Sequence, residues 1–199
     1  FKEQEKEAEN SYDYRDLAEE IAAAGDKKWA QQLFKEAEKL SEDLDDYRDL
    51  ADSVGDVDYL DDKKWASKLY NKAEDLAEDL SDYSGLATSV AWKDFLGDMD
   101  WARKLFKKAE DLAEDSSDYS GLASSVADED YLGDKKYAKE LYNKAEGMAE
   151  DLNDYSSLAG SVADEDYLDD KKYAKELYQK AEDLAEDFND YKDIAMSVA

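Results

Sequence analysis

Three acidic segments hold the residues whose spacing comes closest to that of a metal site. The segments DVDYLDD, DEDYLGD and DEDYLDD place aspartates two residues apart at 56–62, 128–134 and 164–170. Calcium takes six to eight oxygen ligands, which such loops could supply, but an EF-hand loop also needs a glutamate at position twelve. Counting from Asp128, that position holds Lys139. Solvated turns that cap a following helix account for the same aspartates, so we predict no metal and no other cofactor.

Paired carboxylates could also act as acid and base on a glycoside. Here the acidic groups recur along the whole chain, whereas a catalytic pair is one constellation in one pocket. The sequence has no cysteine and no histidine. Thiolate or imidazole metal sites and Cys/His nucleophilic pairs are therefore excluded. We predict that the chain is not an enzyme.

The net charge of −29, from 55 acidic against 26 basic residues, limits the classes of partner. Only three of the bases are arginines, and phosphate recognition depends on arginine forks and a positive surface. Nucleic acid and anionic membrane surfaces are thus disfavoured, and a basic protein or peptide is favoured. No apolar run approaches the roughly 18 residues that span a bilayer, so we predict no membrane insertion.

A repeat of 36 residues organises the chain. Residues 153–188 differ from residues 117–152 at only eight positions. An aromatic residue recurs at the same spacing, as Trp29, Trp65, Trp101, Tyr137 and Tyr173. A fixed period between 20 and 50 residues is typical of stacked-repeat proteins. We divide the chain into a half-repeat helix at 1–10, helix pairs at 11–44, 45–80, 81–116, 117–152 and 153–188, and a closing helix at 189–199.

Each unit of the repeat has the pattern of two helices. In the fourth unit the first helix has an apolar stripe at Tyr119, Leu122, Ala123 and Val126. We expect the second helix to run from Tyr137 through Ala149 to Leu152. An aspartate stands where its N-cap belongs, at Asp26, Asp62, Asp98, Asp134 and Asp170. Gly25 and Gly133 mark the turn between the helices, and Asp61 and Asp169 replace glycine there. A coiled coil is disfavoured because its seam would be broken twice in each unit.

The first full unit resembles the tetratricopeptide repeat family. The residues that carry the resemblance are Tyr14, Leu17, Ala18, Ile21, Gly25, Ala30, Phe34 and Ala37. Later units keep these positions but insert three residues between the helices and lose one residue before the next unit, which lengthens the 34-residue period to 36. The resemblance implies an all-α, right-handed α-solenoid of antiparallel helix pairs. Residues 1–14 align onto residues 34–47, so the chain opens either as a fragment of a longer array or with a half-repeat cap. Because no methionine opens the chain, we expect the fragment.

In the resembling family the first helices line a concave, partner-binding groove. Carried over by position, the groove residues are Arg15, Glu19, Arg48, Asp52, Ser84, Thr88, Ser120, Ser124, Ser156 and Gly160. The small hydroxyl residues among them would let a peptide approach closely. They would equally let adjacent first helices pack against each other, and both interpretations stay open. The carboxylate clamp of some family members is not supported, because Glu19 and Asp52 would repel an anionic terminus.

Two further features bear on binding. Trp92 stands where other units have aspartate, and it could anchor a partner or fill a gap beside Phe95; we favour the gap. Glu146, Glu150 and Asp151 are expected at the C-terminal end of a second helix, against the helix dipole, where they would form an acidic edge.

We therefore predict a non-catalytic protein-interaction or scaffold module that binds a protein or peptide of basic character through the groove or the acidic edge. The alternatives are a structural spacer in a longer surface or extracellular array, and an engineered repeat protein without a natural partner. The ends of the array are further surfaces through which copies could associate.

Overall fold

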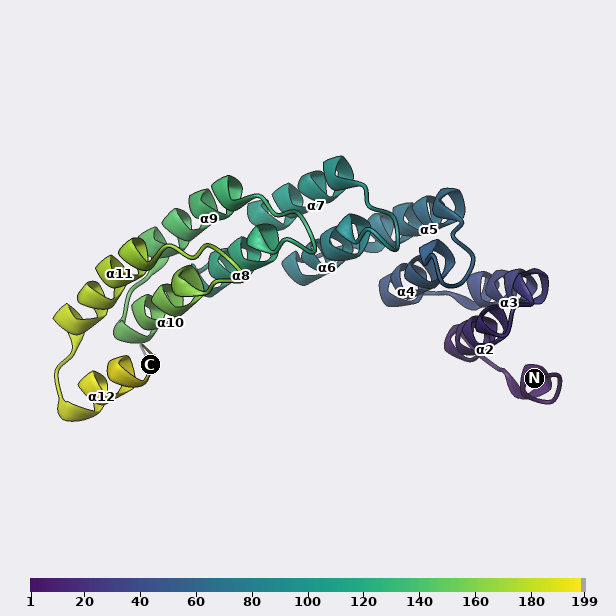
Figure 1. The fold of residues 1–199 in the computed structure, drawn as a ribbon, viewed down its shortest axis with the longest axis horizontal. Coiled ribbons are helices and arrows are strands. Elements are labelled where there is room, and N and C mark those ends of the chain that lie inside the picture. The colour runs from purple at the N-terminus through teal and green to yellow at the C-terminus, as the bar shows by residue number, and fades with distance from the viewer. Residues whose placement is uncertain (198–199) are drawn as a thin grey trace. The chain divides into compact units, whose positions relative to one another are not determined.

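The computed structural model describes residues 1–197, and these residues form helices joined by short turns, without a β-strand (Figure 1). The helices are α1 (Gln4–Glu7), α2 (Ser11–Ala23), α3 (Lys27–Leu40), α4 (Leu44–Gly55), α5 (Lys63–Leu76), α6 (Leu80–Ala91), α7 (Met99–Asp111), α8 (Ser116–Ala127), α9 (Lys135–Met148), α10 (Leu152–Ala163), α11 (Lys171–Leu184) and α12 (Phe188–Ser197). The chain divides into two compact units, residues 1–105 and residues from 106 onward, and the division falls inside α7.

In unit 1, helix α2 packs against α3 and α4 packs against α5, as the predicted pairs require. The first helices α2, α4 and α6 also contact one another in succession, and each second helix contacts the first helix that follows it. In unit 2, α8 pairs with α9 and α10 pairs with α11 (Figure 1). Helix α12 lies against both α10 and α11. The prediction of an all-helical chain built from adjacent helix pairs is confirmed.

The predicted N-caps of the second helices are confirmed. Each of the five aspartates accepts a hydrogen bond from the backbone N–H of the aromatic residue three positions later, at 3.0 to 3.1 Å. This bond satisfies one of the donors that a helix N-terminus leaves unpaired. It also places the aromatic residue in the first turn of every second helix.

The predicted ends of the second helices are wrong. Helix α9 ends at Met148, Ala149 is extended with ψ 127°, and Leu152 begins α10. Asp151 starts the new helix, because its side chain accepts hydrogen bonds from the backbone N–H groups of Asn153 and Asp154. Glu150 and Asp151 therefore lie at the positive N-terminal end of α10, where a carboxylate is favourable rather than opposed to the dipole.

The turns between paired helices explain the glycine and aspartate pattern. Gly25, Gly97 and Gly133 have positive φ angles of 95°, 70° and 60°, and Asp61 and Asp169 adopt the same region at 55° and 51°. Aspartate tolerates this left-handed conformation better than most residues with a side chain. In the lengthened turns the same geometry is thus formed with glycine at Gly97 and Gly133 or with aspartate at Asp61 and Asp169, and the backbone N–H of each donates to the carbonyl five residues earlier.

Both ends of the chain differ in extent from the expected helices. The half-repeat helix predicted for residues 1–10 is only the four-residue α1, although Phe1 still makes an edge-on ring contact with Trp29 at 6.2 Å. The closing helix predicted for residues 189–199 begins at Phe188, and its last two residues lie outside the described part of the chain.

Candidate functional site: the groove residues of the first helices

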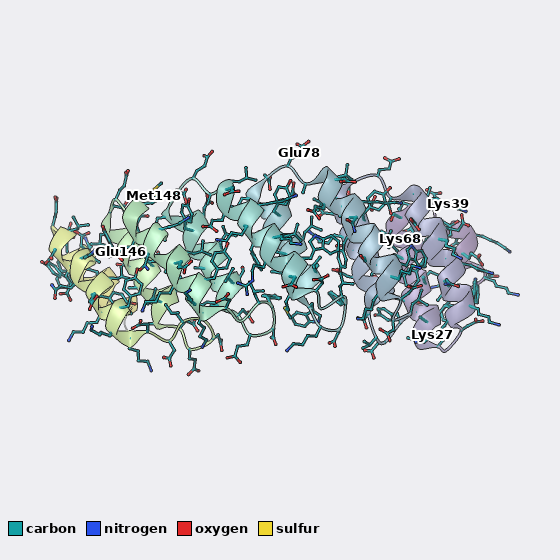
Figure 2. All side chains as sticks on the ribbon, turned by 90° about the horizontal axis from the view of Figure 1, so that it is seen from above. Lys27, Lys39, Lys68, Glu78, Glu146 and Met148 are labelled. Carbon is teal, nitrogen blue, oxygen red and sulfur yellow. The ribbon has the colours of Figure 1, made fainter. Side chains whose placement is uncertain are left out.

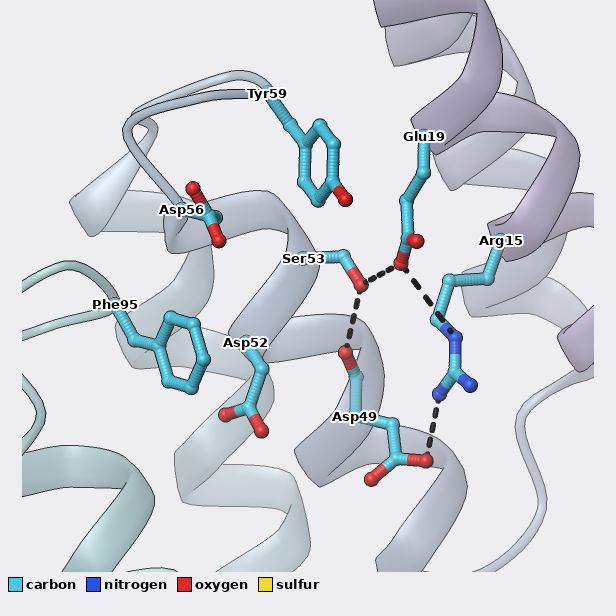
Figure 3. A pocket seen from close by; sticks show the side chains of 8 residues that line it. All are labelled: Arg15, Glu19, Asp49, Asp52, Ser53, Asp56, Tyr59 and Phe95. Atoms are coloured by element: carbon cyan, nitrogen blue, oxygen red, sulfur yellow. Dashed lines mark hydrogen bonds and ion pairs between the residues drawn. The ribbon is translucent and has the colours of Figure 1, made fainter. Parts of the chain in front are cut away.

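Ion pairs and hydrogen bonds connect the groove residues of α2 to helix α4. The Arg15 guanidinium lies 2.7 Å from the Asp49 carboxylate and 3.9 Å from Glu19 on its own helix. The Ser53 hydroxyl donates to the Glu19 carboxylate at 2.5 Å. Figure 3 shows this chain of contacts running from one helix to the other. Arg15 and Glu19 therefore take part in packing the first helices together.

Asp52 holds the same position on α4 that Glu19 holds on α2. Its half-buried carboxylate accepts hydrogen bonds from the Tyr70 hydroxyl at 2.5 Å and from the Ser89 hydroxyl at 3.2 Å. Burial raises the pKa of Asp52 to about 6, although both hydrogen bonds act in the opposite direction. Burial likewise raises the pKa of Glu19, partly offset by Ser53 and Arg15. Both carboxylates thus carry their charge at a cost to the fold.

A cavity of about 290 Å³ opens between these helices (Figure 3). Its lining is strongly acidic and comes from Arg15, Glu19, Asp49, Asp52, Ser53, Asp56, Tyr59 and Phe95. The two rings come from the lengthened turns that follow α4 and α6. Sequence analysis identified the three additional residues in these turns but not their consequence, which is an aromatic side chain placed over the groove of the preceding helix pair.

The other predicted groove residues of unit 1 lie outside this cavity. Arg48 pairs with Asp45 at 2.9 Å and with Asp49 at 3.1 Å, both on its own helix. Ser84 and Thr88 on α6 donate to backbone carbonyls of that helix, at 3.2 and 2.8 Å. These residues satisfy their polar groups locally, as residues of a solvated helical face do.

The predicted groove residues of unit 2 are hydroxyl groups used in packing. The Ser124 hydroxyl lies 3.0 Å from the hydroxyl of Tyr142 and also reaches the Ser120 carbonyl oxygen at 3.1 Å. Ser120 and Ser124 line a shallow cavity of about 330 Å³ between α8 and α10. The Ser156 hydroxyl oxygen is buried without a hydrogen-bond partner among the described residues. The Ser124 contact thus joins α8 to α9 of its own pair, and both interpretations of the small residues, helix packing and partner binding, stay predictions.

Trp92 forms the C-cap of α6, where its backbone N–H donates to Thr88 at 3.0 Å. Its half-buried ring lies 6.2 Å from the Phe95 ring, tilted by 36°. This contact agrees with the gap-filling interpretation. The backbone carbonyl of Trp92 also accepts hydrogen bonds from Phe95, Leu96 and Gly97, which fixes the following turn.

Sequence analysis missed a polar contact that joins successive second helices. In unit 2 the Glu110 carboxylate accepts hydrogen bonds from the Tyr137 hydroxyl at 2.6 Å and from Lys144 at 2.6 Å. The same contact is formed by Glu38 with Trp65 and Lys72, and by Glu146 with Tyr173 and Lys180. The indole N–H of Trp101 donates to Glu74 at 2.7 Å. We call this set of contacts the glutamate clamp.

The glutamate clamp has a sequence signal that the repeat contains. Its glutamates recur every 36 residues, each followed by an aromatic residue 27 positions later and a lysine 34 positions later. Three of these lysines, Lys72, Lys144 and Lys180, also lie over a tyrosine ring of their own helix pair, at 4.9, 5.5 and 5.6 Å from the ring centre. Burial alone would raise the pKa of Glu110, but the hydrogen bonds from Lys107, Lys144 and Tyr137 lower it to about 2.

The three residues predicted to form an acidic edge do not form one free acidic surface, because two of them have structural roles. Glu146, near the C-terminal end of α9 (Figure 2), is a clamp residue held by Tyr173 and Lys180. Asp151 is the N-cap of α10. Of the three predicted residues, these two have structural partners that a basic protein would have to displace.

The aspartates of the acidic loops are bonded to their own backbone. The carboxylates of Asp56, Asp128 and Asp164 each accept a hydrogen bond from the backbone N–H two residues later, at 2.7 to 2.9 Å. Within residues 1–197 no group of three or more His, Cys, Asp or Glu side chains is placed to hold a metal ion. In the same residues no helix is long and apolar enough to cross a membrane.

Comparisons with protein-family models, with curated proteins and with solved structures give no match for this chain.

Proposed function

We propose that the chain is a right-handed, tetratricopeptide-like solenoid that acts as a non-catalytic scaffold and binds a basic segment of another protein. The observation that carries this proposal is the acidic cavity between α2 and α4. Four carboxylates line it against a single guanidinium, and two aromatic rings flank it. The repeated pairing of the helices and the resemblance of the first unit support the solenoid.

A lysine or arginine side chain is complementary in charge to this cavity. A bound cation would offset the cost of holding the Glu19 and Asp52 carboxylates ionised in a partly buried place. The rings of Tyr59 and Phe95 offer faces on which a cation is attracted by the ring quadrupole. The net charge of −29 would also speed the encounter with a basic partner.

The experiment is a selection of unstructured peptides from a display library on residues 1–199, followed by affinity measurements. We expect the selected peptides to be rich in lysine and arginine. Their affinity should fall at least tenfold between 0.1 M and 1 M salt, because the Debye length shortens from about 10 Å to about 3 Å. Asp56→Asn in the cavity should weaken binding, whereas Glu140→Gln on the exposed face of α9 serves as the matched control.

Selected peptides without basic residues, or affinities that neither salt nor Asp56→Asn changes, would contradict the proposal.

A structural spacer in a longer array is the second candidate. It is favoured by the number of groove residues whose polar groups are already bonded to neighbouring helices, as Asp52 is to Tyr70 and Ser89. A spacer would give no enriched peptides in the same selection.

A further inference from the structure

One position of the repeat carries an exposed apolar side chain at the end of every second helix. Each of these residues is the last of its helix or, at Leu112, the next one along the chain. Figure 2 shows Met148 at this end of α9. Five of the ten exposed large apolar side chains that the structure describes are at this position, so they are concentrated there rather than scattered. They are Leu40, Leu76, Leu112, Met148 and Leu184, between 40% and 45% exposed.

The exposure of this position does not depend on the ends of the chain. Leu76 and Leu112 have helix pairs both before and after them. Their side chains are 43% and 41% exposed, nearly the same as the 45% of Leu184 in the last pair. Stacking one pair on the next therefore leaves this position open. The exposure belongs to the repeat itself.

An exposed glutamate stands two residues after each of these apolar residues. The residue between them is an extended, half-buried alanine at Ala77, Ala149 and Ala185. Alternate side chains of an extended backbone point to the same side, so the apolar and the acidic side chain share one surface. We call this surface the leucine–glutamate edge. Its glutamates are Glu42, Glu78, Glu114, Glu150 and Glu186.

The backbone of each edge glutamate is fixed, whereas its carboxylate is available. The backbone N–H donates to the aspartate four residues later in every case, at 2.7 to 2.9 Å. In the part of the chain that the structure describes, residues 1–197, none of the five carboxylates takes part in an ion pair or a side-chain hydrogen bond. A partner can thus pair with them without displacing a contact of the fold, unlike Glu146 or Asp151.

We propose that the leucine–glutamate edge binds a basic amphipathic helix of a partner protein, laid across the ends of the second helices. Packed helices lie about 8–10 Å apart, and an α-helix advances about 10.5 Å in seven residues. A helix with an apolar residue at every seventh position would therefore offer one to each second helix of a unit. Lysines or arginines beside that apolar stripe would face the edge glutamates.

Charge complementarity selects this occupant over the alternatives. The repeated free carboxylates repel an anionic membrane surface and favour a basic segment. A second copy of this chain is a poor partner, because its net charge of −29 would be brought against the same carboxylates. The edge and the groove cavity share no residue, so this inference goes beyond the proposed groove function.

The test uses a labelled helical peptide of three heptads and the full chain. Each heptad has leucine at its first position, lysine at its fourth and fifth positions, and alanine or glutamine elsewhere. These positions place the lysines on either side of the leucine stripe. A control peptide of the same composition carries its leucines on three different sides of the helix. Fluorescence anisotropy should show saturable binding of the first peptide, and binding of the control at least tenfold weaker.

Two sets of substitutions at opposite ends of the same second helices locate the binding site. The edge set should weaken binding about tenfold, because several partly exposed ion pairs are lost. The control set makes the same change in net charge and should bind within about twofold of the wild type. The edge set is Glu78→Gln, Glu114→Gln, Glu150→Gln and Glu186→Gln. The control set, on the exposed turns before these helices, is Asp58→Asn, Asp94→Asn, Asp130→Asn and Asp166→Asn.

Three results would overturn the proposal: no binding of the first peptide, equal binding of the two peptides, or equal losses for the two sets of substitutions. Equal binding of the peptides would show that charge alone attracts them, without the apolar row. Asp56→Asn leaves the edge intact, and the edge set leaves the groove cavity intact. The groove proposal and this one can therefore fail separately.

Discussion

The two units carry different chemistry on the same helical positions. In unit 1 the groove positions of α2 and α4 hold Arg15, Glu19, Arg48 and Asp52, and ion pairs cross from one helix to the next. In unit 2 the equivalent positions hold the uncharged residues Ser120, Ser124, Ser156 and Gly160, of which Ser124 bonds to the Tyr142 hydroxyl and to the Ser120 carbonyl oxygen. The helix pairs form in both cases, so the groove side chains are free to differ without loss of the pair.

The second helices show the opposite behaviour. The glutamate clamp occurs in both units with the same spacing, and only its aromatic donor changes, from the indole of Trp65 and Trp101 to the hydroxyl of Tyr137 and Tyr173. This contrast indicates that the second helices hold successive pairs together and that the groove positions tolerate different side chains.

Removing a clamp glutamate should have the largest effect. Glu110→Ala leaves a tyrosine hydroxyl and two lysines without their acceptor, at a carboxylate that is only 8% exposed. We expect a loss of about 2–4 kcal/mol in the free energy of unfolding of unit 2, measured by urea denaturation. Glu38→Ala should cost about half as much, because its side chain is 27% exposed and accepts from Trp65 and Lys72 alone.

Glu140→Gln, on an exposed face of α9, is the control for Glu110→Ala. Equal and small losses for the control and both clamp variants would show that the clamp does not hold the pairs together.

The close packing of Gly55 against the turn that contains Phe95 should give the next largest effect on the stability of unit 1. A Cβ atom at Gly55 would lie 2.6 Å from the Phe95 carbonyl oxygen, and Lys63 bridges the Gly55 and Asp94 carbonyls. Gly55→Ala should therefore destabilise unit 1 by about 1–3 kcal/mol in urea denaturation, as overpacking does. In unit 2 the same position is Ala127, which is accommodated. A variant as stable as the wild type would mean that the turn of unit 1 can move to the geometry of unit 2.

The stability of unit 1 should depend on pH through the carboxylates of its groove, whereas the serines at the same positions of unit 2 do not titrate. The pKa of Asp52 is raised to about 6, so the folded chain binds its proton more tightly than the unfolded chain does. Its contribution to stability is fully present below about pH 4 and is lost as the pH rises through 6. Asp52→Asn should remove this loss. The free energy of unfolding of the variant should therefore rise by about 1–2 kcal/mol relative to that of the wild type as the pH increases from 4 to 7.

The measurement for Asp52→Asn is urea denaturation at several pH values. Ser124→Ala at the same position of unit 2 is the control, because no titrating group changes there. A stability difference between wild type and Asp52→Asn that stays constant with pH would show that burial does not strain this carboxylate.

The helices, their pairing and the aspartate N-caps were predictable because each depends on residues close in sequence. The end of the second helices was not, because Asp151 could belong to either helix until its bonds to Asn153 and Asp154 were seen. The position of the groove residues followed from the repeat, but their partners did not. The contact of Ser53 with Glu19 and the closure of the cavity by Tyr59 connect different helix pairs, and a single period contains no information on such contacts.

The smallest effect should come from a matched pair of glycines in the first helices. A Cβ at Gly121 on α8 would meet no atom within 4 Å, so Gly121→Ala should stabilise unit 2 by about 0.5–1 kcal/mol through helix propensity. At the same position of α6, a Cβ at Gly85 would lie 3.4 Å from the Arg48 guanidinium. Gly85→Ala should gain less in urea denaturation, because the added methyl group comes into close contact with the Arg48 guanidinium, which pairs with Asp45 and Asp49. Equal gains at both positions would show that Arg48 moves without cost, and the ion pairs of unit 1 would then be as dispensable for stability as the serines of unit 2.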